Sequence, residues 1–198
     1  QLQALIADVA TRAGPPQRCT ATCLGDLFEK VPAGADWIVA DELGIEPIDD
    51  EVWDLVQGPL TSAISDPEGL ANGKPEAFDG LIEGLVMSGL AMQKYRISSR
   101  PASGAGHQFS HLWEMEHLGM DQDPPLTHGF KVGLGTISVL ALWERTLNHD
   151  FSTLDVDAAV AKWPSAEEME AKVRANFTGD SSGTLNDITK RASDELGR

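Results

Sequence analysis

Four of the five histidines in this chain lie in one short segment, "SSRPASGAGHQFSHLWEMEHLGMDQDPPLTHGFKVGLG". His107 and His111 are four residues apart in a stretch that we expect to be helical, so their imidazoles would project from one face and could bind one ion or one substrate. His128 stands where a proline-containing loop meets the next expected helix, and Gly129 leaves space beside it. Three nitrogen donors with an open position would suit zinc, iron or nickel. Spacing alone also allows histidines that bond only to backbone carbonyls or solvent.

Mixed sets of histidine and carboxylate suit the same metals, and the segment "ATCLGDLFEK" offers Asp26. This acid follows Gly25 in an otherwise apolar helical pattern, so a buried Asp26 would need a partner. It could bind a metal, or it could cap a helix or pair with a basic side chain, and the residues alone leave both interpretations open. His117 and His149 lie beside expected helix ends rich in charged residues, and we interpret them as solvated surface residues.

The elements that would position these residues are almost all helices, because apolar residues recur with the helical period along most of the chain, as in "EAFDGLIEGLVMSGLAMQKY". Pro32 predicts a kink or an earlier end in the first long helix. Segments such as "DPEGLANGKP" and "DQDPP" are expected to be loops between helices. The predicted fold is therefore an all-α helical bundle with little or no sheet. Its other expected helices are Cys19–Ala40, Asp50–Ile64, His107–His117, His128–Asn148, Val156–Lys162, Ala166–Asn176 and Leu185–Leu196.

Composition bounds the classes of function. The 198 residues are 41% hydrophobic, which suffices for a sizeable core, and 31 acidic against 15 basic residues give a formal net charge of -16. Such a surface repels phosphate backbones and anionic lipids, so neither nucleic acid nor a membrane is expected as a partner. No stretch approaches the roughly 18 apolar residues of a membrane-spanning helix.

The cysteines and the first residues indicate the setting of the chain. Cys19 and Cys23 are one helical turn apart, a spacing that favours reduced core thiols over a disulfide framework and fits a cytoplasmic protein. The opening "QLQALIADVA" lacks the pattern of a secretion signal, and we interpret it as following a cut inside a longer protein.

Three segments together resemble the glycerol-1-phosphate dehydrogenase family: "GDLFEKVPAGADW", "SSRPASGAGHQFSH" and "HGFKVGLGT". That family is part of the iron-containing alcohol dehydrogenase and dehydroquinate synthase-like superfamily, whose members have an N-terminal dinucleotide-binding domain and a C-terminal helical domain with the metal ligands. The resemblance implies that residues 1–198 are the second domain alone, with the dinucleotide-binding domain absent from this chain. It implies Asp26, His107 and His128 as metal ligands and places His111 beside the metal, near the substrate or the nicotinamide.

The chemistry that the resemblance implies is reversible hydride transfer between NAD or NADP and the C2 carbon of glycerol 1-phosphate, with dihydroxyacetone phosphate as the carbonyl partner. A divalent metal (zinc, nickel or iron) would polarise the C2 oxygen, and His111 would relay the proton. The isolated domain is expected to be inactive, and a homo-oligomer is compatible with the resemblance. Two departures affect the surroundings of the ligands, since the family usually has an acidic residue where this chain has Gly106 and often a second histidine where Gln108 stands.

A phosphorylated polyol substrate would need donors for its phosphate. Ser99, Arg100 and Ser103 form a cluster of hydroxyl and guanidinium groups just before the helix with His107, and Arg100 is the first candidate. These residues could equally serve only to turn a loop. Gly133 and Gly135 lie in an apolar helical stretch and are interpreted as close-packing sites rather than a phosphate-binding turn.

Two other functions stay open at this stage. Another polyol or alcohol dehydrogenase, or a dehydroquinate synthase-like enzyme of the same superfamily, would keep the same three ligands. A protein of a different class, a non-catalytic helical metal-binding module, would keep the ligands without the chemistry.

Overall fold

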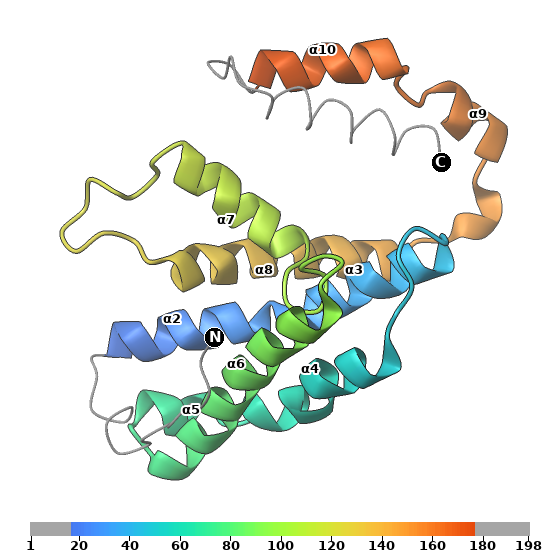
Figure 1. The fold of residues 1–198 in the computed structure, drawn as a ribbon. Helices are drawn as coiled ribbons and strands as arrows, with labels where there is room; N and C mark the ends of the chain where they lie inside the picture. The colour runs from blue at the N-terminus through green and yellow to red at the C-terminus, as the bar shows by residue number, and fades with distance from the viewer. Residues whose placement is uncertain (1–16, 177–198) are drawn as a thin grey trace. The chain divides into compact units, whose positions relative to one another are not determined.

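Helices account for the regular structure of residues 17–176, which are the residues that the computed structural model describes (Figure 1). No strand occurs among these residues, so the predicted all-α class is confirmed. They divide into two units, one ending at Asn148 and the other beginning at His149. The first unit holds α2 (Gln17–Phe28), α3 (Lys30–Glu42), α4 (Asp50–Ala63), α5 (Pro67–Ala71), α6 (Pro75–Tyr95), α7 (Ala105–Met115) and α8 (His128–Leu147). The second holds a short 3-10 helix, η1 (Phe151–Thr153), followed by α9 (Val156–Ala161) and α10 (Ala166–Asn176).

Most helix positions agree with the hydrophobic pattern, and two details differ. The first long helix ends early, as Pro32 predicted, but the break falls at Glu29, which leaves the proline in the first turn of α3, where its missing N–H has no cost. The "DPEG" segment forms α5 instead of a loop, because the carboxylate of Asp66 accepts a hydrogen bond from the backbone N of Gly69 at 2.8 Å and caps the helix. The helix expected at Leu185–Leu196 lies outside the described residues.

Two apolar clusters hold the first unit together. In one, α2 packs against α4, α5 and α6 through buried leucines and Phe78; in the other, α3 packs against α4 and α6 around Trp37. The Trp37 ring makes an edge contact with Tyr95, with ring centroids 4.9 Å apart. These clusters fix α2 and α3 relative to α6, and so they form the base on which α7 and α8 lie.

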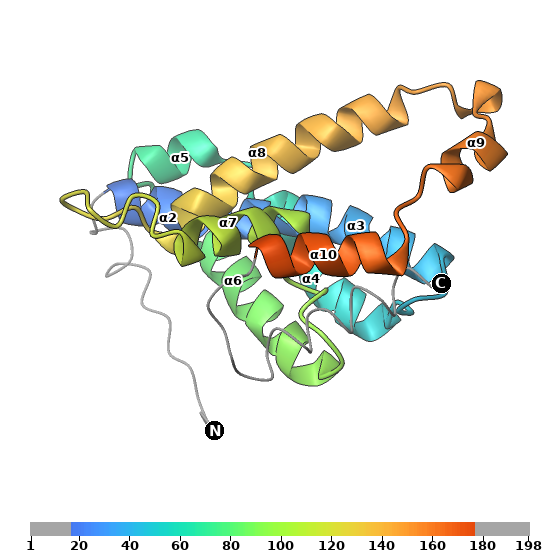
Figure 2. The same cartoon turned by 90° about the horizontal axis from the view of Figure 1, so that it is seen from above.

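The helices α7 and α8 form an antiparallel hairpin, and α8 also packs along α2 (Figures 1 and 2). Glycines let these helices approach backbone to backbone: a Cβ at Gly25 would lie 2.5 Å from the carbonyl O of Gly129, and a Cβ at Gly135 would lie 2.4 Å from the carbonyl O of Gly106. A Cβ at Gly133 would lie 3.3 Å from the Cα of Gly25. The close-packing role predicted for Gly133 and Gly135 is confirmed.

The N-terminus of α7 is capped by carboxylates from another part of the chain. Its own N-cap residue, Gly104, has no side chain to offer. Instead, Oδ2 of Asp36 accepts a hydrogen bond from the backbone N of Ala105 at 2.7 Å, and Oε1 of Glu29 accepts one from the backbone N of Gly104 at 3.0 Å. Anionic groups at a helix N-terminus satisfy its unpaired donors and interact favourably with its dipole. The position of α7, and therefore of its histidines, depends on α3.

Among the described residues, none of the helices is both long enough and apolar enough to cross a bilayer.

Candidate metal centre

Three side chains with metal-binding atoms meet where α2, α7 and α8 converge. Asp26, His107 and His128 each offer one donor atom, and these atoms all lie within 4.8 Å of one another. The imidazole rings of His107 and His128 have centroids 5.5 Å apart, and Nε2 of His107 lies 3.8 Å from Oδ1 of Asp26. The structure therefore brings together the three residues that the resemblance implied as ligands.

Each of the three residues stands next to a glycine at a close helix contact. Asp26 follows Gly25, while Gly129 follows His128 at the start of α8. A Cβ at Gly129 would lie 2.1 Å from the carbonyl O of Thr22, so a larger residue there would push α8 away from α2. The glycines thus set the distance between the helices that the ligand side chains must span.

Asp26 is ionised at neutral pH. Burial raises the pKa of its carboxyl, but the ammonium of Lys30 opposes this through its charge and a hydrogen bond of 2.6 Å to Oδ1, helped by His107 and His128. Together they hold the pKa of Asp26 below its ordinary value of 3.8. Lys30 itself is almost completely buried. Its ammonium is bonded to Oδ1, the oxygen that also faces Nε2 of His107.

His107 and His128 each have a carboxylate beside Nδ1. Oε2 of Glu29 lies 3.0 Å from Nδ1 of His107, and both residues are buried. Oε1 of Glu114 lies 2.9 Å from Nδ1 of His128, and this second pair is partly exposed. A carboxylate on one imidazole nitrogen is the usual companion of a metal on the other, because it fixes the tautomer and the orientation of the ring.

This donor set fits a divalent cation. One carboxylate oxygen and two imidazole nitrogens are ligands that zinc, nickel and iron accept. With neutral imidazoles, the carboxylates of Asp26, Glu29 and Glu114 against the ammonium of Lys30 leave two negative charges (three minus one), which a divalent cation would balance. The buried Oε2 of Glu29 and Nδ1 of His107 also lack any hydrogen bond of good geometry, as expected of a ring whose orientation awaits a ligand on its other nitrogen.

The donor atoms open into a cavity of about 440 Å³, large enough for a small polyol. His111 lines this cavity, with its ring centroid 5.8 Å from that of His107 and 6.0 Å from that of His128, and it is not part of the three-donor set. Ser99 and Ser103, two of the residues predicted to bind a substrate phosphate, line it as well. The remaining walls are Lys30, Leu85, Ser88, Gly89, Met92 and Ala102.

Arg100, the first candidate for a substrate phosphate, does not line the cavity. Its Nε donates a hydrogen bond to Oε2 of Glu46 at 2.8 Å, and Ser98 donates to the other oxygen of the same carboxylate. These bonds tie the segment that carries Ser99 and Ser103 to the loop between α3 and α4. The two terminal nitrogens of the guanidinium make no hydrogen bond to other described residues.

We expect Glu46→Gln to destabilise the fold by about 1–2 kcal/mol at neutral pH, because an uncharged amide loses charge-assisted bonds. Burial raises the pKa of Glu46, but the bonds from Ser98 and Arg100 outweigh burial and hold it below its ordinary value of 4.5. A depressed folded-state pKa means stability that is present above pH 4.5 and lost as the pH falls through the folded value. The free energy of unfolding in urea at about pH 7 and about pH 3 measures this.

A matched control for Glu46→Gln is Glu51→Gln, which removes an exposed ion pair with Lys94 and should change stability far less than Glu46→Gln does. An effect of Glu46→Gln that is as large at low pH as at neutral pH would contradict the role assigned to its charge.

The two departures from the family pattern have different surroundings. A Cβ at Gly106 would lie 2.8 Å from Cγ of Glu29 and 3.2 Å from its Oε1, so the space beside this glycine is filled by a carboxylate from the junction of α2 and α3. Gln108 is exposed on α7 and does not line the cavity. A carboxylate, that of Glu29, therefore lies beside the position directly before His107.

Sequence reasoning missed Glu29, Lys30 and Glu114. A glutamate and a lysine in a helix normally face solvent, so their types alone indicate nothing. The one available signal was Gly106, because a glycine directly before a ligand leaves room for a side chain from a neighbouring helix.

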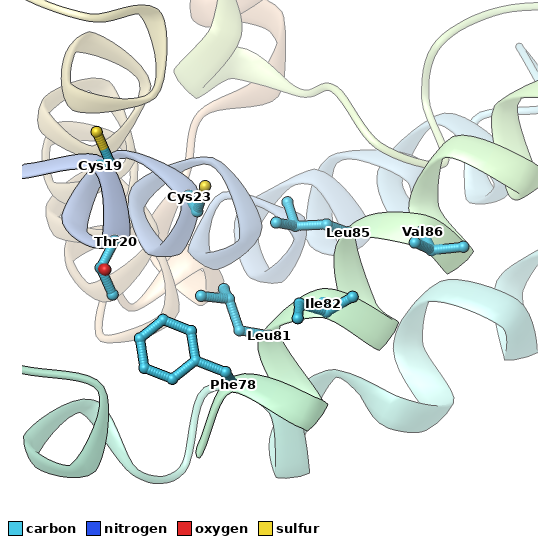
Figure 3. A pocket seen from close by; sticks show the side chains of 8 residues that line it. All are labelled: Cys19, Thr20, Cys23, Phe78, Leu81, Ile82, Leu85 and Val86. Carbon is cyan, nitrogen blue, oxygen red and sulfur yellow. The ribbon is translucent and has the colours of Figure 1, made fainter. Parts of the chain in front are cut away.

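The other histidines and the cysteines take no part in this site. His117 and His149 are exposed, in agreement with their interpretation as surface residues. Cys19 and Cys23 form no disulfide; Cys19 is exposed on α2 rather than in the core, and Cys23 is half-buried. Both border a small apolar hollow of about 80 Å³ between α2 and α6 (Figure 3), which is lined by Cys19, Thr20, Cys23, Phe78, Leu81, Ile82, Leu85 and Val86. This hollow offers no imidazole or carboxylate.

Comparison with known proteins gives relatives over most of the chain. It is 35% identical over 150 residues to a protein of Halalkalibacterium halodurans, covering 76% of this chain and 37% of the relative. It is 38% identical over 130 residues to one of Bacillus velezensis (66% and 32%) and 36% identical over 134 residues to one of Pyrococcus horikoshii (68% and 37%). All three are glycerol-1-phosphate dehydrogenases [NAD(P)+], and the chain spans about a third of their length. No family model matches the chain.

Proposed function

Because this chain belongs to the glycerol-1-phosphate dehydrogenase family, we propose that it is the metal- and substrate-binding domain of an NAD(P)-dependent enzyme that interconverts glycerol 1-phosphate and dihydroxyacetone phosphate. The observation that carries this proposal is the convergence of Asp26, His107 and His128, from three different helices, at the wall of a cavity with hydroxyl donors. An open cavity beside the donor atoms is typical of a catalytic metal site, whereas a structural one is closed by its ligands.

Asp26, His107 and His128 would hold a divalent ion, with zinc, nickel or iron as candidates. When bound, the ion would supply Lewis-acid stabilisation of negative charge on the C2 oxygen of the substrate. His111 would accept the proton from the C2 hydroxyl on oxidation and return it on reduction, since it lines the same cavity without being one of the three donors.

The substrate phosphate would lie at the other end of the cavity, against the segment before α7. Ser99 and Ser103 would donate hydroxyl hydrogen bonds, because both line the cavity. Arg100 does not line the cavity and is bonded through Nε to Glu46, so it would contribute its positive charge at longer range.

The dinucleotide would be bound mainly by a separate N-terminal domain. The matched residues make up about a third of the relatives' length, which leaves ample chain for such a domain. Hydride transfer would then occur between the two domains, and the isolated chain would bind metal without turnover.

The test is an assay of the protein that carries this domain together with its dinucleotide-binding domain. We expect the protein to reduce dihydroxyacetone phosphate and to oxidise NADH or NADPH at the same time. The loss of absorbance of the reduced nicotinamide measures the rate. Removing the metal with a chelator should lower the rate by at least about 10²-fold, since Lewis-acid stabilisation contributes several kcal/mol. Zinc, nickel or iron should restore the rate.

Two other outcomes would contradict the proposal in different parts. A metal-dependent enzyme that reduces an unphosphorylated hydroxyketone to its polyol but does not reduce dihydroxyacetone phosphate would show that the substrate is wrong. A protein that binds metal and catalyses no hydride transfer with any polyol phosphate would be a metal-binding module.

A further inference from the structure

Glu29 lies at the one-residue break between α2 and α3, and its side chain is completely buried. Oε1 accepts a hydrogen bond from the backbone N of Gly104 at 3.0 Å. Oε2 lies 3.0 Å from Nδ1 of His107, and neither atom makes a hydrogen bond of good geometry in this structure. Removing a carboxylate from water is unfavourable unless both of its oxygens find partners, so these two contacts are what the burial of Glu29 depends on.

We infer that Glu29 is a positioning residue that sets the tautomer and the orientation of His107, an inference that rests on the metal site proposed above. A carboxylate can only accept a hydrogen bond, so it selects the tautomer with the proton on Nδ1. The lone pair is then on Nε2, which is the nitrogen that faces Asp26 at 3.8 Å. The close contact between Glu29 and His107 lacks hydrogen-bond geometry in this structure, and a ligand on Nε2 would fix the ring in the orientation that makes the bond.

Gly106 makes this arrangement possible. A Cβ at this position would lie 2.8 Å from Cγ of Glu29 and 3.2 Å from the backbone N of Thr136, so any other residue would displace the carboxylate or separate α7 from α8. Glu29 can therefore reach His107 only past a glycine.

Capping of α7 and positioning of His107 are two separate roles that mutagenesis can distinguish. Asp36 also binds the N-terminus of α7, through the backbone N of Ala105 at 2.7 Å, but it does not contact His107. Asp36→Asn is therefore a matched control for Glu29→Gln. In both variants an amide replaces a carboxylate at the same helix end, a buried one at Glu29 and a partly buried one at Asp36.

Glu29→Gln leaves the shape of the side chain nearly unchanged but removes one of its two acceptors. The amide can accept from the backbone N of Gly104 or from Nδ1–H of His107, and its NH₂ group must then face the other donor. We expect His107 in this variant to lose its preference for the Nδ1–H tautomer. Long-range ¹H–¹⁵N NMR spectra of the full 198-residue chain without metal, at a pH where imidazole is neutral, report the tautomer directly.

Zinc affinity, measured by competition with a chromophoric chelator, is the second readout. We expect Glu29→Gln to weaken zinc binding by about 10–100-fold, the usual effect of removing the carboxylate partner of a metal-binding histidine. Asp36→Asn should leave the affinity within about threefold while lowering thermal stability to a similar extent, since it weakens the cap and the bond that Trp143 donates to Oδ1 without touching His107.

The outcomes separate the inference from the proposed metal site. His107 as the Nδ1–H tautomer in the unmodified chain, with a loss of zinc affinity specific to Glu29→Gln, supports the inference. The Nε2–H tautomer in the unmodified chain, or equal losses of affinity in both variants, overturns it. An unmodified chain that binds neither zinc, nickel nor iron overturns the proposed metal site itself. If Glu29→Gln does not fold, the tautomer in the unmodified chain still decides.

Discussion

His107→Ala is expected to abolish metal binding and turnover together. Removing one of three proposed ligands should weaken metal binding by more than the loss of an outer carboxylate does, and therefore by more than about 10²-fold. Turnover should fall with occupancy, because the negative charge that develops on the substrate oxygen would no longer be stabilised. Metal content by elemental analysis and kcat with dihydroxyacetone phosphate, both in the protein that contains both domains, measure the two effects.

The matched control for this variant is His149→Ala. His149 is exposed in the second unit, where its ring contacts Phe151, and it should change neither metal content nor kcat. Retention of a full equivalent of metal by His107→Ala would show that the ion is bound elsewhere. Loss of metal together with loss of helical circular dichroism would indicate unfolding, so the comparison is made between variants with the same helix content.

The helices could be predicted from the sequence because their apolar period is strong, whereas their exact ends depend on tertiary contacts. Pro32 predicted an interruption, yet the chain breaks three residues earlier, at Glu29, whose carboxylate is bound by α7. The short helix α5 has ordinary signals, an N-cap Asp66 followed by Pro67, but its length of five residues is too small for a hydrophobic period to reveal it.

Only part of the proposed metal site could be predicted from the sequence. The spacing of His107 and His111 could not say which of the two would bind a metal, and the role of Asp26 was open until the family resemblance was considered. The carboxylates beside the histidines could not be predicted. Glu29, for example, is buried through its contact with a helix that begins 76 residues later in the chain (105 minus 29). A residue type predicts its own average environment, whereas a metal site is defined by what several helices bring to one place.

His111→Ala is expected to retain the metal and to lose mainly turnover. His111 shares a face of α7 with His107, but it does not belong to the three-donor set and lines the cavity where the substrate would lie. A positioned general acid or base typically contributes about 10² to 10⁴-fold to the rate, so kcat should fall by that factor while metal content and the Km for the nicotinamide cofactor stay unchanged. Steady-state kinetics and elemental analysis of the metal-loaded protein provide both numbers.

Gln108→Ala is the control on the same helix, since Gln108 is exposed and does not line the cavity, and it should leave kcat within about twofold. If His111→Ala loses its metal while His107→Ala keeps it, the assignment of ligand and proton relay within this pair is reversed. The structure argues against that reversal, because only His107 has both a buried carboxylate on Nδ1 and an aspartate carboxylate facing Nε2. A histidine fixed on both nitrogens can hold an ion, but it cannot carry a proton between substrate and solvent, so the two roles must fall on different residues.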